Sequence, residues 1–262
     1  MTTDLDSLLE LALSIVDDVA PTIVAARNSG VLAVNTKSSG TDMVTEMDRW
    51  SETQIHTAIV AARPDDGFLG EEGGRRPGTS DVLWIVDPID GTTNYLYDVP
   101  GFSISIAAEV AGRMAVGVVA DPVRREVFSA VAGRGAHRNG APIGANTTDE
   151  LATSLVGTGF AYQAERRVEQ AHALRHVIGE VRDIRRMGGA ALDLCSVACG
   201  RLDAFYERGL APWDVAAGGV IATEAGAVLL GEGQIPGVDD LTICAGPCIA
   251  EDLTRLLVAA HR

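Results

Sequence analysis

Eleven residues in the first half of the chain read Trp84-Ile85-Val86-Asp87-Pro88-Ile89-Asp90-Gly91-Thr92-Thr93-Asn94. Three apolar residues lead into Asp87, so we expect a buried strand over residues 84–86 that delivers this carboxylate to the edge of a sheet. Pro88 has no N–H with which to extend the ladder and predicts a turn directly after the strand. The turn would bring Asp90 back beside Asp87.

The residues that follow Asp90 are of the types that bind an anion at the start of a helix. Gly91 lets a ligand approach the backbone closely, and the next three residues favour helix N-caps, where free N–H groups attract negative charge. A simpler interpretation is a capped strand-to-turn junction. That interpretation leaves the second carboxylate without a partner, and two like charges held together are costly unless a proton or a cation intervenes. The stretch therefore indicates a cation site beside a phosphate site.

Two other stretches place acidic residues at a similar junction. A short apolar run over residues 68–70 ends in Glu71 and Glu72, followed by two glycines, and Asp214 stands at the predicted start of a helix. Either site alone is explained by solvated loop acids or by helix capping. Three such sites in one chain favour Mg²⁺, which prefers oxygen ligands and leaves places for water and phosphate. Two such ions ~3.5–4 Å apart can clamp both oxygens of an in-line displacement.

The remaining elements follow from hydrophobic periodicity. Apolar residues three and four apart predict an amphipathic helix over the first 27 residues, with Pro21 as a kink or break, and a second helix over residues 48–62. Short runs rich in valine and isoleucine predict strands with hairpin connections at 84–86, 102–110, 115–120 and 127–131. From residue 151, strands (155–157, 181–185, 202–206, 227–230, 241–245) alternate with helices (165–178, 190–198, 214–224, 249–259).

This order of elements favours a mixed α/β fold of layered sheets with helices packed on them. We expect one compact catalytic unit over residues 1–262. Its approximate subdomains are 1–146, with the metal and phosphate motifs, and 147–262, with the substrate side and the last metal ligand. The stretch 140–148 is the expected boundary, and the two halves would share one cleft.

Charge and hydropathy narrow the classes of function. The 262 residues include 36 acidic and 21 basic side chains, and the net charge of −15 opposes binding to nucleic acid or anionic membranes and suits bound cations. The apolar runs fall far short of the ~20 residues that a membrane span requires. Asp4, Asp6 and Glu10 stand where a signal peptide would carry basic residues, so we expect a cytoplasmic protein.

Four cysteines form two C-x-x-x-C pairs, Cys195 with Cys199 and Cys244 with Cys248. A zinc or disulfide role is disfavoured because the neighbours are apolar, no histidine lies close by in the sequence, and the spacing differs from that of common zinc knuckles. We expect the four to be small buried hydrophobes.

Several separated motifs, taken in order, resemble the inositol monophosphatase family over nearly the whole chain. They are Lys37-Ser38-Ser39-Gly40-Thr41-Asp42-Met43-Val44-Thr45-Glu46-Met47-Asp48, Gly70-Glu71-Glu72, Asp87-Pro88-Ile89-Asp90-Gly91-Thr92-Thr93-Asn94-Tyr95, Arg186-Met187-Gly188-Gly189-Ala190-Ala191-Leu192-Asp193, Tyr206-Glu207 and Trp213-Asp214-Val215-Ala216-Ala217-Gly218. The resemblance implies a five-layer α-β-α-β-α sandwich of the inositol monophosphatase and fructose bisphosphatase type, usually assembled as a homodimer.

The same resemblance implies roles for individual residues. The first Mg²⁺ would be bound by Glu71, Asp87 and the carbonyl of Ile89, and the second by Asp87, Asp90 and Asp214. Glu71 would also reach a weaker third ion. The N–H groups of Gly91 and Thr92 would hold the phosphate. The substrate's hydroxyl-bearing side would be met by Asp90, Gly189, Ala190, Glu207 and Asp214.

The implied mechanism needs no covalent phosphoenzyme. The first ion would acidify a bound water that Glu71 and the Thr92 hydroxyl orient toward phosphorus, and the second ion would stabilise the leaving alkoxide. Asp48 would hydrogen-bond Thr92 and raise its basicity. Lithium would inhibit by occupying the second position.

Two positions bear on the substrate. Gly189 stands where members of the family commonly have Ser or Thr, and this lost hydroxyl loosens substrate preference. Thr93 stands where related histidinol phosphate and adenosine bisphosphate phosphatases more often have Lys, which favours a polyol. The expected reaction is hydrolysis of inositol monophosphate. Fructose 1,6-bisphosphate, histidinol phosphate or a nucleotide phosphate are alternative substrates, and a protein-binding module that retains this fold is an alternative of another class.

Overall fold

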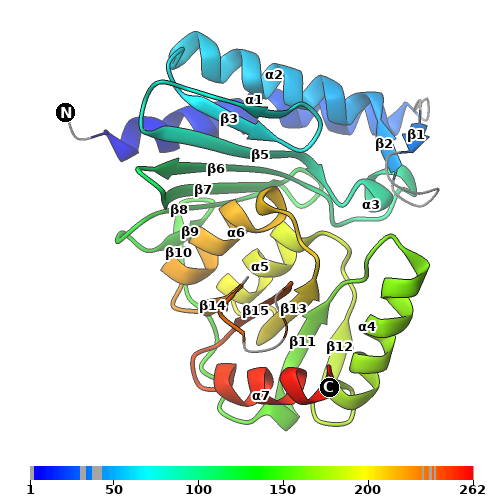
Figure 1. Cartoon of the computed structure of the whole chain (residues 1–262). Helices are drawn as coiled ribbons and strands as arrows, with labels where there is room; N and C mark the ends of the chain where they lie inside the picture. Colours follow the sequence, from blue (N-terminus) through cyan, green and yellow to red (C-terminus); the bar gives the residue numbers. More distant parts are fainter. Residues whose placement is uncertain are drawn as a thin grey trace.

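The computed structural model describes residues 3–29, 34–36, 43–231, 233–235, 238 and 240–261. Helices and sheets alternate in five layers, α-β-α-β-α, which confirms the predicted fold class (Figure 1). Residues 37–42, the first part of one of the motifs above, lie outside the described residues. Within the described part of the chain, no helix has both the length and the apolar character needed to cross a bilayer.

The first layer is the helix pair α1 (Leu5–Asn28) and α2 (Glu46–Ala62). α1 buries a stripe of apolar residues three and four apart, among them Leu8, Ile15 and Ile23, against the first sheet. It continues through Pro21 as one helix, so the sequence-based alternative of a break is wrong. Two short antiparallel strands, β1 (Val34–Thr36) and β2 (Met43–Thr45), lead into α2.

The second layer is an eight-stranded sheet in the order β10-β9-β8-β7-β6-β5-β3-β4. Its strands are β3 (Gly67–Gly70), β4 (Gly74–Arg76), β5 (Val82–Asp90), β6 (Ser103–Val110), β7 (Arg113–Asp121), β8 (Glu126–Val131), β9 (Ala136–Arg138) and β10 (Ala141–Ile143). The predicted hairpin connections are present, because consecutive strands from β5 to β10 pair antiparallel. β3 instead runs parallel to β5, so the carboxyl ends of these two strands meet at one edge.

Strand β5 does not end before Asp87 as predicted but continues to Asp90. Asp87 pairs with Ser105 and Asp90 with Ser103, so three steps along β5 match two steps along β6 and a bulge accommodates the extra residue. Pro88, which has no N–H to donate, lies in this irregular stretch. A bulge, and not a turn, therefore sets the spacing of the two aspartates.

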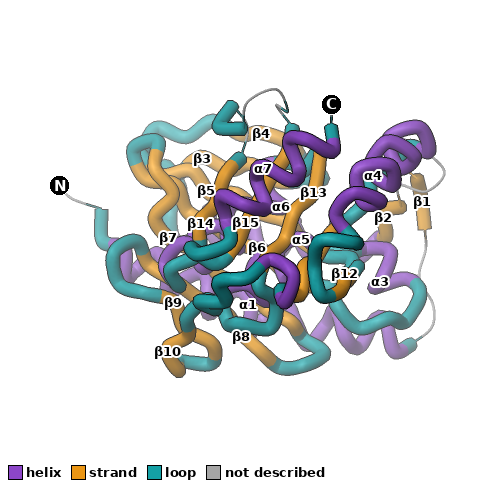
Figure 2. Tube along the Cα trace, turned by 90° about the horizontal axis from the view of Figure 1, so that it is seen from below, coloured by secondary structure: helices purple, strands orange, loops and turns teal. Residues whose placement is uncertain are grey.

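The other three layers come from the second half of the chain. Helices α5 (Ala190–Ala198) and α6 (Pro212–Glu224) lie between the two sheets (Figure 1). The second sheet has the order β12-β11-β13-β15-β14, with strands β11 (Leu155–Thr158), β12 (Asp183–Arg185), β13 (Ala204–Arg208), β14 (Val228–Leu230) and β15 (Leu241–Ala245). Helices α4 (Ala164–Val177) and α7 (Ala250–Ala260) form the fifth layer and pack against each other, as the view from that side shows (Figure 2).

Apolar clusters fill the spaces between these layers. Several boundaries differ from those predicted: β13 begins two residues later than residue 202, and β12 begins two residues later than residue 181. The short strands β4, β9 and β10 and a 3₁₀ turn at Leu151–Thr153 had not been predicted. All four cysteines are free; Cys195 and Cys244 are buried as expected, whereas Cys248 is exposed.

Candidate active site

One cavity, of about 360 Å³, is lined by residues from both halves of the chain. It gathers the turn after β3, the end of β5, the start of the short helix α3 (Thr92–Leu96), the segment before α5, the end of β13 and the start of α6. The predicted site residues that line it are Glu71, Asp87, Ile89, Asp90, Gly91, Thr92, Ala190, Glu207 and Asp214. Asp48 and Gly189 are buried and do not line the cavity.

The register of the first sheet brings Glu71 and Asp87 together. Gly70 of β3 lies opposite Val86 of β5, so the residues that follow each of them are neighbours. The N–H of Glu71 donates to the Val86 carbonyl at 3.3 Å, which continues the pairing by one step. The side chains of Glu71 and Asp87 then share a hydrogen bond.

Asp87 is only 2% exposed, and the pKa of its carboxyl lies well above the ordinary value of 3.8. Burial is the largest cause, followed by the negative charges of Glu71, Asp90 and Asp214 and by the hydrogen bond with Glu71. The crowding of acids around Asp87 therefore favours its neutral form, and a bound cation would offset the same negative charges.

The sequence predicted that Asp214 is the N-cap of a helix. It is instead the third residue of α6. Its carboxylate reaches back and accepts a hydrogen bond from the N–H of Ala211 at 2.7 Å. Burial and then the charge of Asp90 hold the pKa of Asp214 well above 3.8. Burial raises the pKa of Glu207 to about 7, although Arg186 opposes this. The Glu207 carboxyl lies against the backbone of Gly159, where a Cβ would be 1.9 Å from Oε2.

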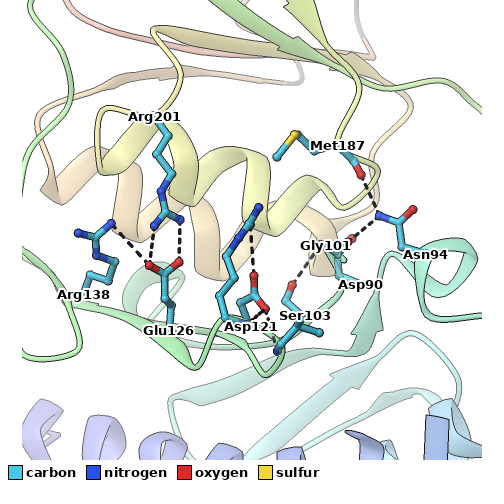
Figure 3. A network of polar contacts seen from close by, with 11 residues as sticks. Asp90, Asn94, Gly101, Ser103, Asp121, Glu126, Arg138, Met187 and Arg201 are labelled. Atoms are coloured by element: carbon cyan, nitrogen blue, oxygen red, sulfur yellow. Dashed lines mark hydrogen bonds and ion pairs between the residues drawn. The ribbon is translucent and has the colours of Figure 1, made fainter. Parts of the chain in front are cut away.

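Asp90 ties the first half of the chain to the second. Its carboxylate accepts hydrogen bonds from the N–H groups of Ala190 and the next residue, at 3.2 and 3.0 Å, where α5 begins. Asn94 makes a second link, because its Nδ2 donates to the carbonyls of Gly101 and Met187, both at 2.8 Å (Figure 3). The segment that precedes α5 is thereby held against the junction of β5 and α3.

Burial raises the pKa of Asp90 to about 6, even though the hydrogen bonds from α5 oppose this shift; the charge of Glu71 adds to it. The close approach of α5 also explains why position 189 is a glycine. A Cβ on Gly189 would lie 2.8 Å from Oδ2 of Asp90 and 3.2 Å from the carbonyl of Gly101. A serine or threonine at this position would therefore have to displace Asp90 or the neighbouring backbone.

Thr92 and Asp48 form a buried pair under the cavity. The Thr92 hydroxyl lies 3.1 Å from Oδ1 of Asp48 and 3.1 Å from the carbonyl of Ile89, and it donates its single proton to one of these acceptors at a time. The predicted contact of Asp48 with Thr92 is thus present. The other oxygen of Asp48 accepts from the N–H and the hydroxyl of Thr45, and burial raises the pKa of Asp48 to about 6.

The start of α3 differs in detail from the predicted helix cap. Gly91 is the N-cap residue, in a left-handed conformation with φ of 82°, and no side chain caps the helix. A Cβ on Gly91 would lie 2.8 Å from the carbonyl of Gly101, so both the backbone angle and the close packing favour glycine. The helix has five residues, and Thr92 is the first of them.

Part of the cavity wall had not been predicted. It consists of Gly159, Phe160, Ala161, Tyr162, Gln163, Arg166, Arg186, Gly188, Arg208, Gly209, Leu210, Ala211 and Trp213. Thr93, which was expected to bear on the substrate, also lines the cavity. Residues 159–163 follow β11, which runs parallel to β13, and loops at the carboxyl ends of such strands are frequent ligand sites. Among the described residues, no three His, Cys, Asp or Glu side chains stand ready-made around one ion position.

Residues 4–260 match the model of the inositol monophosphatase family. The chain is 44% identical over 247 residues to inositol-1-monophosphatase SuhB of Mycobacterium tuberculosis, covering 89% of this chain and 84% of that protein. It is 43% identical over 205 residues to the Nus factor SuhB of Pseudomonas aeruginosa, covering 76% and 75%. The crystal structure of extragenic suppressor protein suhB from Bartonella henselae has a TM-score of 0.90 at 33% identity, covering 96% and 98%.

Proposed function

The chain belongs to the inositol monophosphatase family, and from this premise we propose that it is a Mg²⁺-dependent phosphomonoesterase that hydrolyses inositol monophosphate to inositol and phosphate. Family membership supports a phosphatase. The observation that carries the finer proposal is the set of four acidic side chains, Glu71, Asp87, Asp90 and Asp214, that line one cavity beside Thr92. Three of them have pKa values raised by burial and by one another.

The donor set fits Mg²⁺ by its chemistry, because carboxylate and carbonyl oxygens are the ligands that this ion prefers. Glu71, Asp87 and the Ile89 carbonyl would hold one ion, and Asp87, Asp90 and Asp214 a second, with Glu71 reaching a weaker third. The mutual repulsion of these acids, which raises the pKa of Asp87, is what a bound cation would relieve.

Bound Mg²⁺ would supply acidification of the attacking water and compensation of the charge on the phosphate and the leaving oxygen. Glu71 and the Thr92 hydroxyl would orient that water. Asp48 would accept the Thr92 proton, which turns an oxygen lone pair of Thr92 toward the cavity. The N–H groups of Gly91 and Thr92 would hold the phosphate. Asp90, Ala190, Glu207 and Asp214 would form the wall that meets the polyol, with Gly189 packed directly against Asp90.

A substrate panel with and without Mg²⁺ tests this proposal. Phosphate release would be measured from inositol 1-phosphate, fructose 1,6-bisphosphate, histidinol phosphate and a nucleoside monophosphate. We expect Mg²⁺-dependent turnover, fastest on inositol phosphate. If inositol phosphate is the poorest substrate, the narrow assignment fails, and if no substrate is hydrolysed, the phosphatase proposal fails. Asp87→Asn should abolish turnover, whereas Asp18→Asn, an exposed aspartate on α1, should leave it unchanged.

A second candidate function rests on the relatives that carry the name Nus factor SuhB. As the alternative, we propose that this chain is a protein-binding module that retains the phosphatase fold and acts through a protein partner. A folded Asp90→Asn variant that loses turnover but retains the cellular effect of the wild type would support this alternative, and loss of both would oppose it. We also propose that the protein is a cytoplasmic homodimer. Sedimentation of the purified protein would test the oligomeric state.

A further inference from the structure

Helix α2 buries a polar face that contacts the segments carrying the acidic residues of the cavity. Asp48, Ser51 and Glu52, spaced as i, i+3 and i+4, lie on one side of the helix and are 0%, 0% and 5% exposed. We call these three residues the α2 polar face. Buried polar groups are costly unless they are hydrogen-bonded, so their partners indicate what the face is for. Each of the three binds a different segment that carries proposed site residues.

Glu52 binds the turn that follows Glu71. Its two carboxylate oxygens accept hydrogen bonds from the N–H groups of Glu72 at 2.7 Å and Gly73 at 2.6 Å. The turn is wrapped so closely that a Cβ on Gly70 would lie 2.4 Å from Oε2 and a Cβ on Gly73 would lie 2.7 Å from Oε1. Glu71 is thus held on both sides, by β5 through its own N–H and by Glu52 through the next two residues.

Ser51 binds the segment that carries the two aspartates of β5. Its hydroxyl donates to the carbonyl of Pro88 at 3.1 Å, inside the bulge between Asp87 and Asp90. Asp48, one turn earlier, accepts from Thr92 at the start of α3. Little more than one turn of α2 therefore fixes three separate segments relative to one another.

We propose that Ser51 and Glu52 are positioning residues that hold the cation ligands of β5 and of the β3–β4 turn at a fixed separation, an inference that rests on the proposed function. Glu71, Asp87 and Asp90 repel one another when ionised. A turn without an anchor would relax away from β5 and enlarge the space between the ligands. Glu52 prevents this through backbone N–H groups, so it restrains Glu71 without neutralising its charge.

The test compares Glu52→Gln with Glu46→Gln, which removes the same charge from an exposed site on the same helix. Glutamine keeps one acceptor oxygen and loses the other, so one of the two N–H bonds is lost. We expect the Kd for Mg²⁺, measured by calorimetry without substrate, to rise about tenfold, the factor that one hydrogen bond to a charged group supplies. Glu46→Gln should stay within about twofold of the wild type.

Two further readouts separate positioning from a general loss of stability. Hydrogen exchange of the Glu72 and Gly73 amides should accelerate in Glu52→Gln, and the Mg²⁺ concentration for half-maximal activity should rise more than kcat falls. If Glu52→Gln does not fold, Ser51→Ala takes its place, with an expected rise in the Mg²⁺ Kd of about threefold for a neutral hydrogen bond.

The outcomes distinguish this inference from the proposed function. A variant with lower thermal stability but an unchanged Mg²⁺ Kd overturns the positioning role and leaves the phosphatase proposal intact. A wild-type chain that binds no Mg²⁺ overturns both. A higher Kd together with faster exchange in the turn supports the inference, whichever phosphate ester proves to be the substrate.

Discussion

Asp90→Asn should stabilise the metal-free protein at pH 8 while it removes the response to Mg²⁺. Asp90 is 7% exposed, and burial with the charge of Glu71 raises its pKa to about 6. At pH 8 this carboxyl is ionised in both the folded and the unfolded chain, so the folded state bears the cost of a buried charge. Asparagine has nearly the same shape and no charge.

The magnitude follows from the pKa of Asp90. A rise from 3.8 to about 6 is roughly 2 pKa units, which at about 1.4 kcal/mol each corresponds to about 3 kcal/mol. Asparagine keeps one acceptor oxygen where the carboxylate uses two for α5 and Ser103, so about 1 kcal/mol is lost again. The expected net gain of about 2 kcal/mol corresponds to a rise in Tm of roughly 4–8 °C for a chain of this size.

The assay is thermal unfolding at pH 8 with a chelator and then with excess Mg²⁺. The wild type should gain about 2.7 kcal/mol at a hundredfold excess of Mg²⁺ over Kd, and Asp90→Asn should gain much less. Asp121→Asn is the control, because Asp121 is 1% exposed but pairs with Arg124 and accepts from two backbone N–H groups (Figure 3). It should lower the Tm. The reasoning is refuted if Asp90→Asn is destabilised like the control, or if it responds to Mg²⁺ like the wild type.

Three other outcomes are expected. Lithium at millimolar levels should slow phosphate release relative to sodium, and equal rates would contradict the second cation position. The free energy of unfolding of the metal-free protein should fall as pH rises from about 5.5 to 8. Asp90 and Glu207 have pKa values of about 6 and 7 in the folded protein, so at the lower pH the folded state binds protons that the unfolded state has lost. A Tm that does not change with pH over this range would contradict this. Asn94→Ala, which loses the bonds to Gly101 and Met187, should raise KM about tenfold with a smaller change in kcat, and an unchanged KM in initial-rate measurements would show that this link does not shape the site.

The positions of the acidic residues along the chain were predictable because strand ends have local signatures. Apolar runs that stop at Gly70 and Val86 indicate where side chains emerge from a sheet. The fact that Glu71 and Asp87 are neighbours depends on β3 running parallel to β5 in one particular register. Register is a property of two strands together, and no single run of residues specifies it.

The details of the site show the same limit. The sequence predicted a turn at Pro88, but the pairing of β5 with β6 absorbs the proline in a bulge. It predicted Asp214 as an N-cap, whereas the helix begins two residues earlier and Asp214 reaches back to Ala211. In both places the residue type is compatible with two local arrangements, and the pairing or packing around it selects one.

Glu52 illustrates a residue that periodicity hides. In the sequence it is one polar residue among several in a helix, and its neighbours Thr53 and Gln54 are exposed. Only the packing of α2 against the turn after Glu71 distinguishes it, through contacts that span about twenty residues of chain. The role of a polar residue on the buried face of a helix is therefore best inferred from its hydrogen-bond partners.

The aspartates of the cavity are held in a way that does not cancel their negative charge. Backbone N–H groups anchor Asp90, Asp214 and Glu52. Within the part of the chain that the structure describes, Asp87, Asp90 and Asp214 form no ion pair with lysine or arginine. An arginine would fix a carboxylate equally well but would cancel its charge. Backbone donors fix the geometry and leave the charge in place for a cation to offset.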